Sequence, residues 1–250
     1  MQRYFVKAVN WNAETNKVII TGDDVHHIQR VMRNEIDDEI ICIHPDKTVA
    51  RCKITQIDKE FVESQIVSLE ESQTEMPIKV SVVQSLPKGD KLDLIMQKGT
   101  ELGANSFYLY EAERSIVKWN KQKIQKRMIR LNKIIKEAAE QSYRKVIPTL
   151  YEPGNLKELI EATQDHQVKL IAYEEEAKKG KSSYQFQREI EKLQPGEKLV
   201  IFIGPEGGFT KNEINQLTES GFKPVKLGNR ILRTETASFY ALSAISYHFE

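Results

Sequence analysis

The chain has 250 residues, of which 40% are hydrophobic and 29% charged, with a formal net charge of +1 and two cysteines. Its longest uninterrupted apolar run, Leu199–Ile203, is far shorter than the roughly 20 residues of a membrane-spanning helix, and its first residues lack the apolar core of a signal peptide. The composition therefore argues against a membrane-embedded or secreted protein and predicts a cytoplasmic one. Two cysteines are too few for a disulfide framework or a thiolate metal cluster, so we expect Cys42 and Cys52 to be reduced core thiols and no metal to be bound.

The N-terminal part of the chain has the pattern of short strands around one short helix. Period-two alternation and β-branched residues mark five strands, at 3–9, 17–20, 38–45, 48–58 and 61–69. The segment 21–33 has a helical pattern, with Thr21 or Asp23 as its N-cap. Its predicted apolar face consists of Val25, Ile28, Val31 and Met32. These elements predict a small barrel or sandwich.

After an acidic stretch at 70–75 and Met76–Pro77, the pattern changes to alternating strands and helices. We therefore expect one domain over 1–72 and a second over 73–250. Strands are predicted at 78–85, 107–110, 168–173, 198–203 and 223–228, and helices at 88–102, 121–143, 155–163, 183–193, 210–220 and 236–248. Alternation of this kind predicts an α/β domain with a mostly parallel sheet.

The charge is unevenly distributed along the chain. Residues 1–72 hold 9 basic and 13 acidic side chains, net −4, and residues 73–250 hold 28 and 23, net +5. Within the second part, residues 112–147 hold 11 basic side chains and three acidic ones, net +8. This segment is either a solvated helix face or a phosphate-binding stripe. The scarcity of acidic residues at i+4 spacing favours the second interpretation, because a purely solvated helix face usually carries such ion pairs.

Two loops follow late strands of the predicted sheet, where ligands bind in open α/β folds. The first, GPEGGFTKNE at 204–213, combines three glycines with a T-x-x-E capping box at Thr210 and Glu213. It matches neither the dinucleotide-binding nor the P-loop pattern. The second, LGNRILRTETAS at 227–238, brings Arg230, Arg233 and Glu235 close to apolar residues. Each loop by itself is also compatible with a purely structural role, as a tight turn or as an ion pair that anchors a loop.

Taken together, GPEGGF, LGNRILRTETA, QSLPKGDKLDLIMQKGTELG at 84–103 and EAAEQSYR at 137–144 resemble the ribosomal RNA small subunit methyltransferase E family. The resemblance covers nearly the whole chain, including RYF at 3–5 and HHIQRVMR at 26–33. Members of this family methylate N3 of the uridine at position 1498 of 16S rRNA and belong to the SPOUT superfamily. The resemblance implies a trefoil-knotted C-terminal methyltransferase domain with a mostly parallel sheet, preceded by a small PUA-like β-barrel that binds RNA.

The resemblance also implies S-adenosylmethionine as the cofactor and a homodimer. The cofactor contacts carried over to this sequence fall on the two glycine-containing loops. They are Ile203, Gly204, Pro205, Glu206, Gly207, Gly208, Leu227, Gly228, Leu232, Arg233, Thr236 and Ala237.

The uracil N3 carries a proton, so methylation requires an unpaired base and loss of that proton. An arginine, Arg144 or Arg233, is expected to stabilise the developing uracil oxyanion, with Glu140 and Gln141 orienting the substrate. The predicted RNA-binding residues are Arg3, Arg30, Arg33, Arg114, Lys121, Arg127, Gln141 and Arg144. Two alternatives remain: a SPOUT 2′-O-ribose methyltransferase of rRNA or tRNA, and a non-catalytic RNA-binding protein of ribosome assembly.

Overall fold

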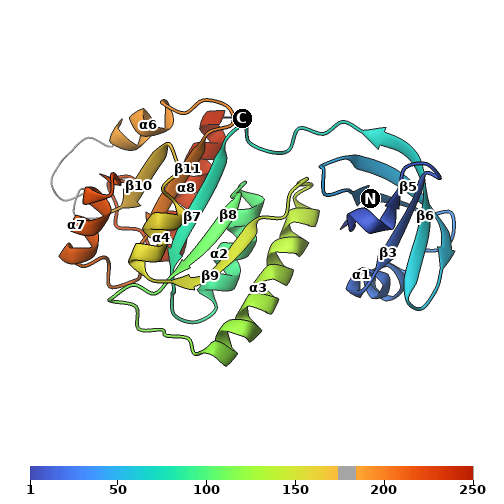
Figure 1. Cartoon of the computed structure of the whole chain (residues 1–250), viewed down its shortest axis with the longest axis horizontal. Helices are drawn as coiled ribbons and strands as arrows, with labels where there is room; N and C mark the ends of the chain where they lie inside the picture. The colour runs from blue at the N-terminus through green and yellow to red at the C-terminus, as the bar shows by residue number, and fades with distance from the viewer. Residues whose placement is uncertain (174–183, 250) are drawn as a thin grey trace. The chain divides into compact units, whose positions relative to one another are not determined.

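A computed structural model describes residues 1–173 and 184–249 (Figure 1). These residues form two units, each with its own six-stranded sheet. The first unit comprises Met1–Glu75 together with Ala139–Val146, and the second comprises Met76–Ala138 together with Ile147–Glu250. None of the helices in the described ranges is long and apolar enough to span a bilayer.

The N-terminal unit is built on a sheet with the strand order β1-β4-β5-β6-β3-β2. Neighbouring strands are antiparallel except for β1 and β4, which are parallel. The strands are β1 Arg3–Phe5, β2 Trp11–Asn12, β3 Lys17–Thr21, β4 Glu39–Ile43, β5 Val49–Ile57 and β6 Phe61–Glu70. The first strand is shorter than predicted because a 3-10 turn, η1 Ala8–Asn10, follows it.

Alternation along these strands directs every second side chain into a common core, which includes Val18 and Ile20 of β3. Cys42 and Cys52 lie in this core as free thiols, as predicted. Cys42 is paired in register with Ala50, and Cys52 with Ile40. The two thiols are therefore diagonal neighbours on one face of the hairpin.

The predicted helix over 21–33 begins as α1 Asp23–His26 and continues as a π-helical segment, η2 His27–Met32. Its N-cap is Gly22, without a side-chain cap, so the prediction of Thr21 or Asp23 at this position is wrong. Val25 and Ile28 are buried as predicted, but Val31 and Met32 are exposed. The wider π winding shifts the later side chains away from the face that a 3.6-residue repeat would give.

The second unit has the strand order β12-β10-β11-β7-β8-β9, and every neighbouring pair is parallel. Its strands are β7 Lys79–Ser85, β8 Ser106–Tyr110, β9 Thr149–Gly154, β10 Val168–Ala172, β11 Lys198–Ile203 and β12 Lys223–Val225. Its helices are α2 Lys91–Glu101, α3 Lys121–Gln141, α4 Leu156–Ala162, α6 Tyr184–Ile190, α7 Lys211–Glu219 and α8 Thr234–Phe249. The parallel α/β prediction is confirmed.

In the second unit, the strand that the sequence did not predict is β9; in the first unit it is the two-residue strand β2. Strand β9 forms one edge of the sheet and pairs only with β8. Its sequence, TLYEPG, lacks a clear alternation and contains Pro153, which an edge strand tolerates because one side of its backbone needs no ladder partner.

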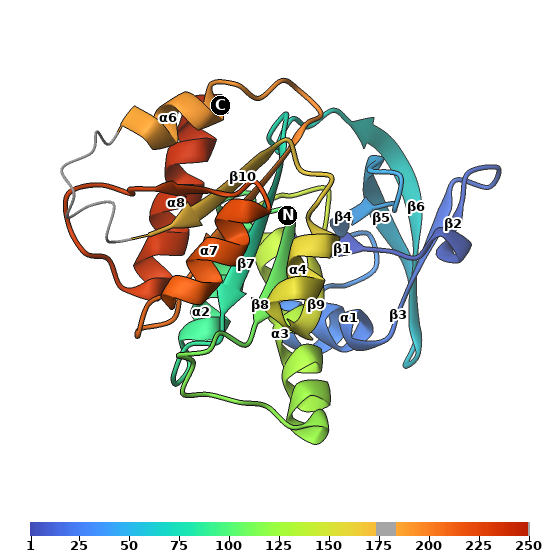
Figure 2. The same ribbon diagram turned by 60° about the vertical axis from the view of Figure 1, so that its left-hand side comes forward.

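Helices cover both faces of the parallel sheet. Alternate residues of β11 divide between two cores: Leu199, Ile201 and Ile203 face the core that contains side chains of α2, α3, α6 and α8. Val200 and Phe202 face the core that contains side chains of α4 and α7. Figure 2 shows α4 and α7 in front of the strands and α8 behind them. The central strands are therefore buried on both faces, as their continuous apolar sequence predicts.

The C-terminal cap of α3 contains an unusual residue. Arg144 N donates to Ala139 O at 2.9 Å and Tyr143 N to Glu140 O at 3.3 Å, which is the hydrogen-bond pattern of a Schellman cap. The position that this cap holds in a left-handed conformation is usually glycine, but here it is Tyr143, with φ +63°. A left-handed conformation costs a residue with a Cβ roughly 1–2 kcal/mol.

A buried histidine near the amino ends of the parallel strands predicts a pH dependence of stability. His166 Nε2 lies 2.8 Å from Ser81 Oγ, and its Nδ1 lies 3.0 Å from a carboxylate oxygen of Asp165. Burial disfavours the charged imidazolium and lowers the pKa of His166, although Asp165 opposes this shift. Because the unfolded chain binds the proton more readily, stability should fall as the pH drops below about 6.5.

We expect His166→Gln to flatten this dependence. The measurement is the difference between the melting temperatures at pH 7.5 and pH 5.5 for the wild type and for the variant. An equal difference in both proteins would contradict the assignment.

Candidate functional site

Loops at the carboxyl ends of the parallel strands surround a cavity of about 470 Å³. This edge of an open α/β sheet is where ligands bind, and the volume is typical of small-molecule sites. A smaller cavity of about 70 Å³ shares Leu232 and Ala237 with it and is also lined by Leu227 and Gly228. The larger cavity is lined by Lys91, Arg114, Ala172, Tyr173, Ile203, Gly204, Pro205, Glu206, Gly207, Gly208, Phe209, Ile231, Leu232, Arg233, Thr234 and Ala237.

The GPEGGF loop between β11 and α7 forms a tight turn that requires its glycines. Gly208 N donates to Pro205 O at 2.9 Å, and Gly208 has φ +67°. A Cβ on Gly204 would lie 3.0 Å from the ring of Phe209, which folds back over this residue. The loop backbone therefore borders the cavity directly, and the absence of side chains at its glycines lets a ligand approach it closely.

Glu213 anchors the end of this loop. Thr210 and Glu213 form the capping box that the sequence predicted at the start of α7. The Glu213 carboxylate is 1% exposed; it accepts hydrogen bonds from Thr210 N at 2.7 Å, from Glu113 N at 3.0 Å and from the hydroxyl of Tyr110. Burial raises the pKa of Tyr110, so this hydroxyl remains a donor. One carboxylate thus joins the loop after β11 to the segment after β8.

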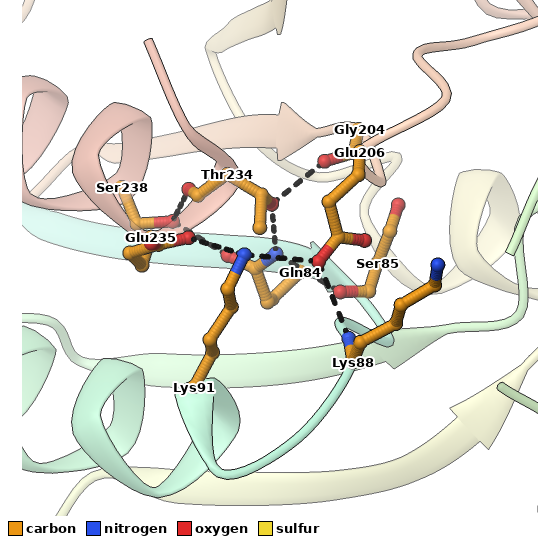
Figure 3. Close-up of polar contacts among 9 residues, drawn as sticks. All are labelled: Gln84, Ser85, Lys88, Lys91, Gly204, Glu206, Thr234, Glu235 and Ser238. Atoms are coloured by element: carbon orange, nitrogen blue, oxygen red, sulfur yellow. Dashed lines mark hydrogen bonds and ion pairs between the residues drawn. The ribbon is translucent and has the colours of Figure 1, made fainter. Parts of the chain in front are cut away.

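A buried amide holds the other walls of the cavity together (Figure 3). Gln84, at the carboxyl end of β7, donates through Nε2 to Thr234 Oγ1 at 2.9 Å and accepts from Ser238 Oγ at 2.5 Å. Thr234 Oγ1 in turn donates to the carbonyl of Gly204 at 2.7 Å. A single chain of hydrogen bonds therefore connects β7, the first turns of α8 and the GPEGGF loop.

A charged cluster lies beside this network (Figure 3). Lys91 Nζ lies 3.0 Å from Glu206 Oε1 and 3.3 Å from Glu235 Oε2. Burial alone would raise the pKa of Glu206, but hydrogen bonds from backbone amides and from Lys91 outweigh it and hold this pKa below its usual value. The cluster favours the ionised form of the Glu206 carboxylate and ties the loop after β7 to the loops that border the cavity.

Arg114, which the sequence predicts to contact RNA, is exposed and donates hydrogen bonds to the GPEGGF loop. Its Nη1 donates to the carbonyl of Gly207 at 3.1 Å and to that of Phe209 at 3.3 Å. The Cβ of Arg114 would also lie 3.2 Å from a Cβ placed on Gly207. This arginine therefore supports the backbone of the cavity wall.

Most of the predicted cofactor residues line one of the two cavities. Thr236 lines neither of them and is exposed. The cavity-lining residues to which sequence reasoning gave no binding role are Lys91, Ala172, Tyr173, Phe209, Ile231 and Thr234. Ala172 and Tyr173 were predictable in principle, because Ala172 ends β10 and Tyr173 follows it at the same edge of the sheet. Lys91 comes from the start of a helix and carried no such signal.

Comparison with known proteins decides the family. The model of an RNA methyltransferase domain matches residues 74–246, and that of an RNA methyltransferase PUA domain matches residues 20–67. The ribosomal RNA small subunit methyltransferase E of Bacillus subtilis is 44% identical over 251 residues, covering 100% of this chain and 98% of the relative. The chain belongs to this methyltransferase E family.

Two solved structures of similar proteins contain the cofactor. A methyltransferase from Legionella pneumophila in complex with S-adenosylmethionine has a TM-score of 0.85 at 29% identity, covering 98% of this chain and 97% of its own. The methyltransferase E of Neisseria gonorrhoeae bound to S-adenosyl methionine has a TM-score of 0.83 at 26% identity, covering 100% and 98%.

In this methyltransferase E, the residues of the N-terminal unit that the sequence assigned to RNA binding or catalysis are divided into exposed and buried ones. Arg30 and Arg33 are exposed on and just after η2. Arg3 is buried, with its guanidinium carbon 4.3 Å from the centre of the Tyr143 ring. Arg144 is also buried and forms a 2.6 Å ion pair with Glu75. Glu140 is buried beside it, and Gln141 is exposed.

The basic helix α3 is likewise divided. Arg127 and Arg130 both form 2.8 Å ion pairs with Asp93 of α2, and Arg127 also lies over the ring of Trp119. Lys121, Lys123 and Lys126 are exposed, and no described acidic side chain forms an ion pair with them. Within the described ranges, no group of three or more His, Cys, Asp or Glu side chains is arranged to hold a metal ion.

Proposed function

We propose that this chain transfers a methyl group from S-adenosylmethionine to N3 of the uridine at position 1498 of 16S rRNA. As a member of the methyltransferase E family, the chain is an S-adenosylmethionine-dependent rRNA methyltransferase. The observation that carries the proposal is the cavity at the carboxyl ends of the parallel strands, whose walls are joined through Gln84 and Thr234. The B. subtilis relative supports the choice of substrate.

The residues that border the cavity fit the cofactor. Loop carbonyl and amide groups at Gly204–Gly208 offer hydrogen bonds to an adenine ring or a ribose, and the missing Cβ atoms allow close approach. Leu232 and Ala237 supply an apolar surface for a ring. When bound, S-adenosylmethionine supplies a methyl group attached to a positively charged sulfur, and this sulfur is a good leaving group. The chain's contribution is then to hold the uracil and the donor in line.

Arg233 is our candidate for stabilising the negative charge that develops on the uracil when N3 loses its proton. It lines the cavity and is exposed to an incoming substrate. Arg144 is the weaker candidate, because its guanidinium is buried and bonded to Glu75. Glu140 and Gln141 are proposed to orient the substrate.

We propose residues 1–72 as a PUA-like RNA-binding domain and residues 73–250 as the methyltransferase domain. In the second domain, we propose that the loops after β11 and β12 form a trefoil knot, which is an exception to the rule that chain connections do not knot. The all-parallel second sheet and the match of the RNA methyltransferase domain model to residues 74–246 support the assignment of the second domain. A homodimer in the cytoplasm, without a bound metal, completes the proposal. Light scattering of the purified protein tests the dimer.

The identity of the methylated nucleoside tests the reaction. The protein is incubated with labelled S-adenosylmethionine and small ribosomal subunits that lack the methyl group, and the labelled nucleoside is identified. N3-methyluridine is the expected product. A 2′-O-methylated nucleoside would favour the first alternative activity, and bound RNA without transferred label would favour the non-catalytic one.

Replacing Lys121, Lys123 and Lys126 with glutamine should weaken RNA binding and its salt dependence. Each lost phosphate contact lowers the slope of log affinity against log salt, so three contacts predict a slope smaller by about 2 to 3. Filter binding between 50 and 200 mM salt measures this slope. The matched control is Lys157→Gln with Lys211→Gln, two exposed residues on helices of the opposite sheet face. An unchanged slope in the triple variant would remove α3 from the RNA-binding surface.

Arg114→Met should weaken cofactor binding more than RNA binding. The substitution removes two charge-assisted hydrogen bonds to loop carbonyls, so we expect the dissociation constant for S-adenosylmethionine to rise about 5- to 20-fold. Titration calorimetry measures it. If RNA affinity falls while cofactor affinity stays at the wild-type value, Arg114 belongs to the RNA-binding surface that the sequence suggested.

A further inference from the structure

The exposed ring of Tyr143 is the feature that the methyl-transfer chemistry leaves unexplained. Among the residues that the structure describes, five that are not glycine have positive φ, and the four besides Tyr143 are Asn16, Arg33, Asp37 and Lys47. Tyr143 is the only aromatic member of this set, and a bulky residue in this conformation is a genuine outlier. Glycine would satisfy the same cap without strain. We therefore ask what the tyrosine ring contributes at this position that glycine would not.

The ring is fixed from one side by a buried cation. The guanidinium carbon of Arg3 lies 4.3 Å from the ring centre, and Nη1 of Arg3 donates to the carbonyl of Tyr143 at 3.3 Å. Arg3 is 6% exposed, whereas Tyr143 is 48% exposed. Since the arginine covers one face, the accessible area of the ring lies on its other face and its edge.

The following two residues are fixed as well. Arg144 Nη2 pairs with Glu75 Oε2 at 2.6 Å, and the amide of Lys145 donates to Glu75 Oε1 at 2.9 Å. The side chain of Lys145 also donates to the carbonyl of Ser72. The turn that carries the ring is therefore held in place before any ligand arrives, which keeps the conformational cost of binding small.

We propose that Tyr143 is a stacking platform for an unpaired base of the RNA substrate. Unpaired bases stack on aromatic side chains regardless of their sequence, and a rigid, half-exposed ring is suited to this contact. The inference rests on the proposed function for its choice of RNA as the ligand. It adds a contact to the substrate outside the cofactor cavity, made by the N-terminal unit and the residues 139–146 that belong to it.

Three variants separate stacking from a structural role. Tyr143→Phe keeps the ring, Tyr143→Leu keeps an apolar cover over Arg3 without aromatic character, and Tyr143→Gly removes the side chain and the backbone strain. The loss of one stacked base corresponds to about a 5- to 150-fold weaker interaction. We expect KM for unmethylated small ribosomal subunits to rise by this factor in the Leu and Gly variants and to stay within about twofold of the wild type in the Phe variant. S-adenosylmethionine affinity should be unchanged in all three.

A binding measurement keeps the inference independent of the reaction. A single-stranded RNA of about ten nucleotides that contains 2-aminopurine should lose fluorescence on binding to the wild type and to Tyr143→Phe, and lose much less with Tyr143→Leu and Tyr143→Gly. Wild-type KM and quenching in the Leu and Gly variants would overturn the proposal. So would a parallel loss of cofactor affinity and melting temperature, since that result assigns Tyr143 a purely structural role. Failure of the proposed function would instead appear in the wild type, as a different methylated nucleoside.

Discussion

Replacing Gln84 with methionine should raise the dissociation constant for S-adenosylmethionine about 10- to 100-fold, which corresponds to about 1.4–2.7 kcal/mol. The substitution keeps the volume of the side chain but removes its bonds to Thr234, Ser238 and the carbonyl of Ser85. These partners are buried, and a buried polar group left without a bond costs about 1–3 kcal/mol. The carbonyl of Gly204 then loses its fixed position, because Thr234 no longer receives the hydrogen bond from Gln84 that orients its hydroxyl. Titration calorimetry and the rate of methyl transfer measure the effect.

Gln84→Glu is the companion variant. It keeps an oxygen to accept from Ser238 but replaces the Nε2 donor with a second acceptor, which faces the carbonyl of Ser85 and the hydroxyl of Thr234. We expect it to impair cofactor binding at least as strongly as Gln84→Met. Wild-type affinity in both variants would show that the hydrogen-bond chain does not position the loop.

Glu213→Gln should lower the free energy of unfolding by about 2–4 kcal/mol. The amide nitrogen of the glutamine cannot accept a hydrogen bond, so it would face an N–H donor that the carboxylate now satisfies. Whichever way the amide turns, either the amide of Thr210 or the pair of donors from Glu113 and Tyr110 loses its acceptor. Urea denaturation followed by circular dichroism measures the loss.

The matched control for that substitution is Glu219→Gln, at the other end of α7, where the side chain is exposed. A change at such a surface position is expected to stay within about 0.5 kcal/mol. Equal effects of the two substitutions would show that the hydrogen bonds of the buried carboxylate do not contribute to stability. A stability loss in Glu213→Gln together with weaker cofactor binding would connect the anchor to the cavity wall.

The sequence was sufficient to locate the cavity, because strands and helices that alternate place the residues after each strand at one edge of the sheet. GPEGGF follows β11, and Leu227 lies two residues beyond the end of β12. The capping box at Thr210 was equally readable, since its two members lie three residues apart. These features depend on neighbours in the chain, and local patterns record such neighbours.

Long-range partners could not be read in the same way. Nothing near Arg114 in the sequence indicates that it will donate to Gly207, and nothing near Arg144 indicates Glu75. Both residues carry the charge expected of an RNA contact, so sequence reasoning assigned them that role. The exposed lysines of α3 differ from its arginines only because Asp93 lies within reach of Arg127 and Arg130, which is a property of the packed helices.

The eight residues 139–146 belong to the N-terminal unit, although the chain on both sides of them belongs to the second unit. No single truncation of the chain can therefore yield either unit complete. A fragment that ends at residue 75 would leave the guanidinium of Arg3 without Tyr143 and the carboxylate of Glu75 without Arg144. The remaining fragment would carry an arginine and a tyrosine whose partners had been deleted. Any exchange of N-terminal units between relatives would have to transplant two separate stretches of sequence together.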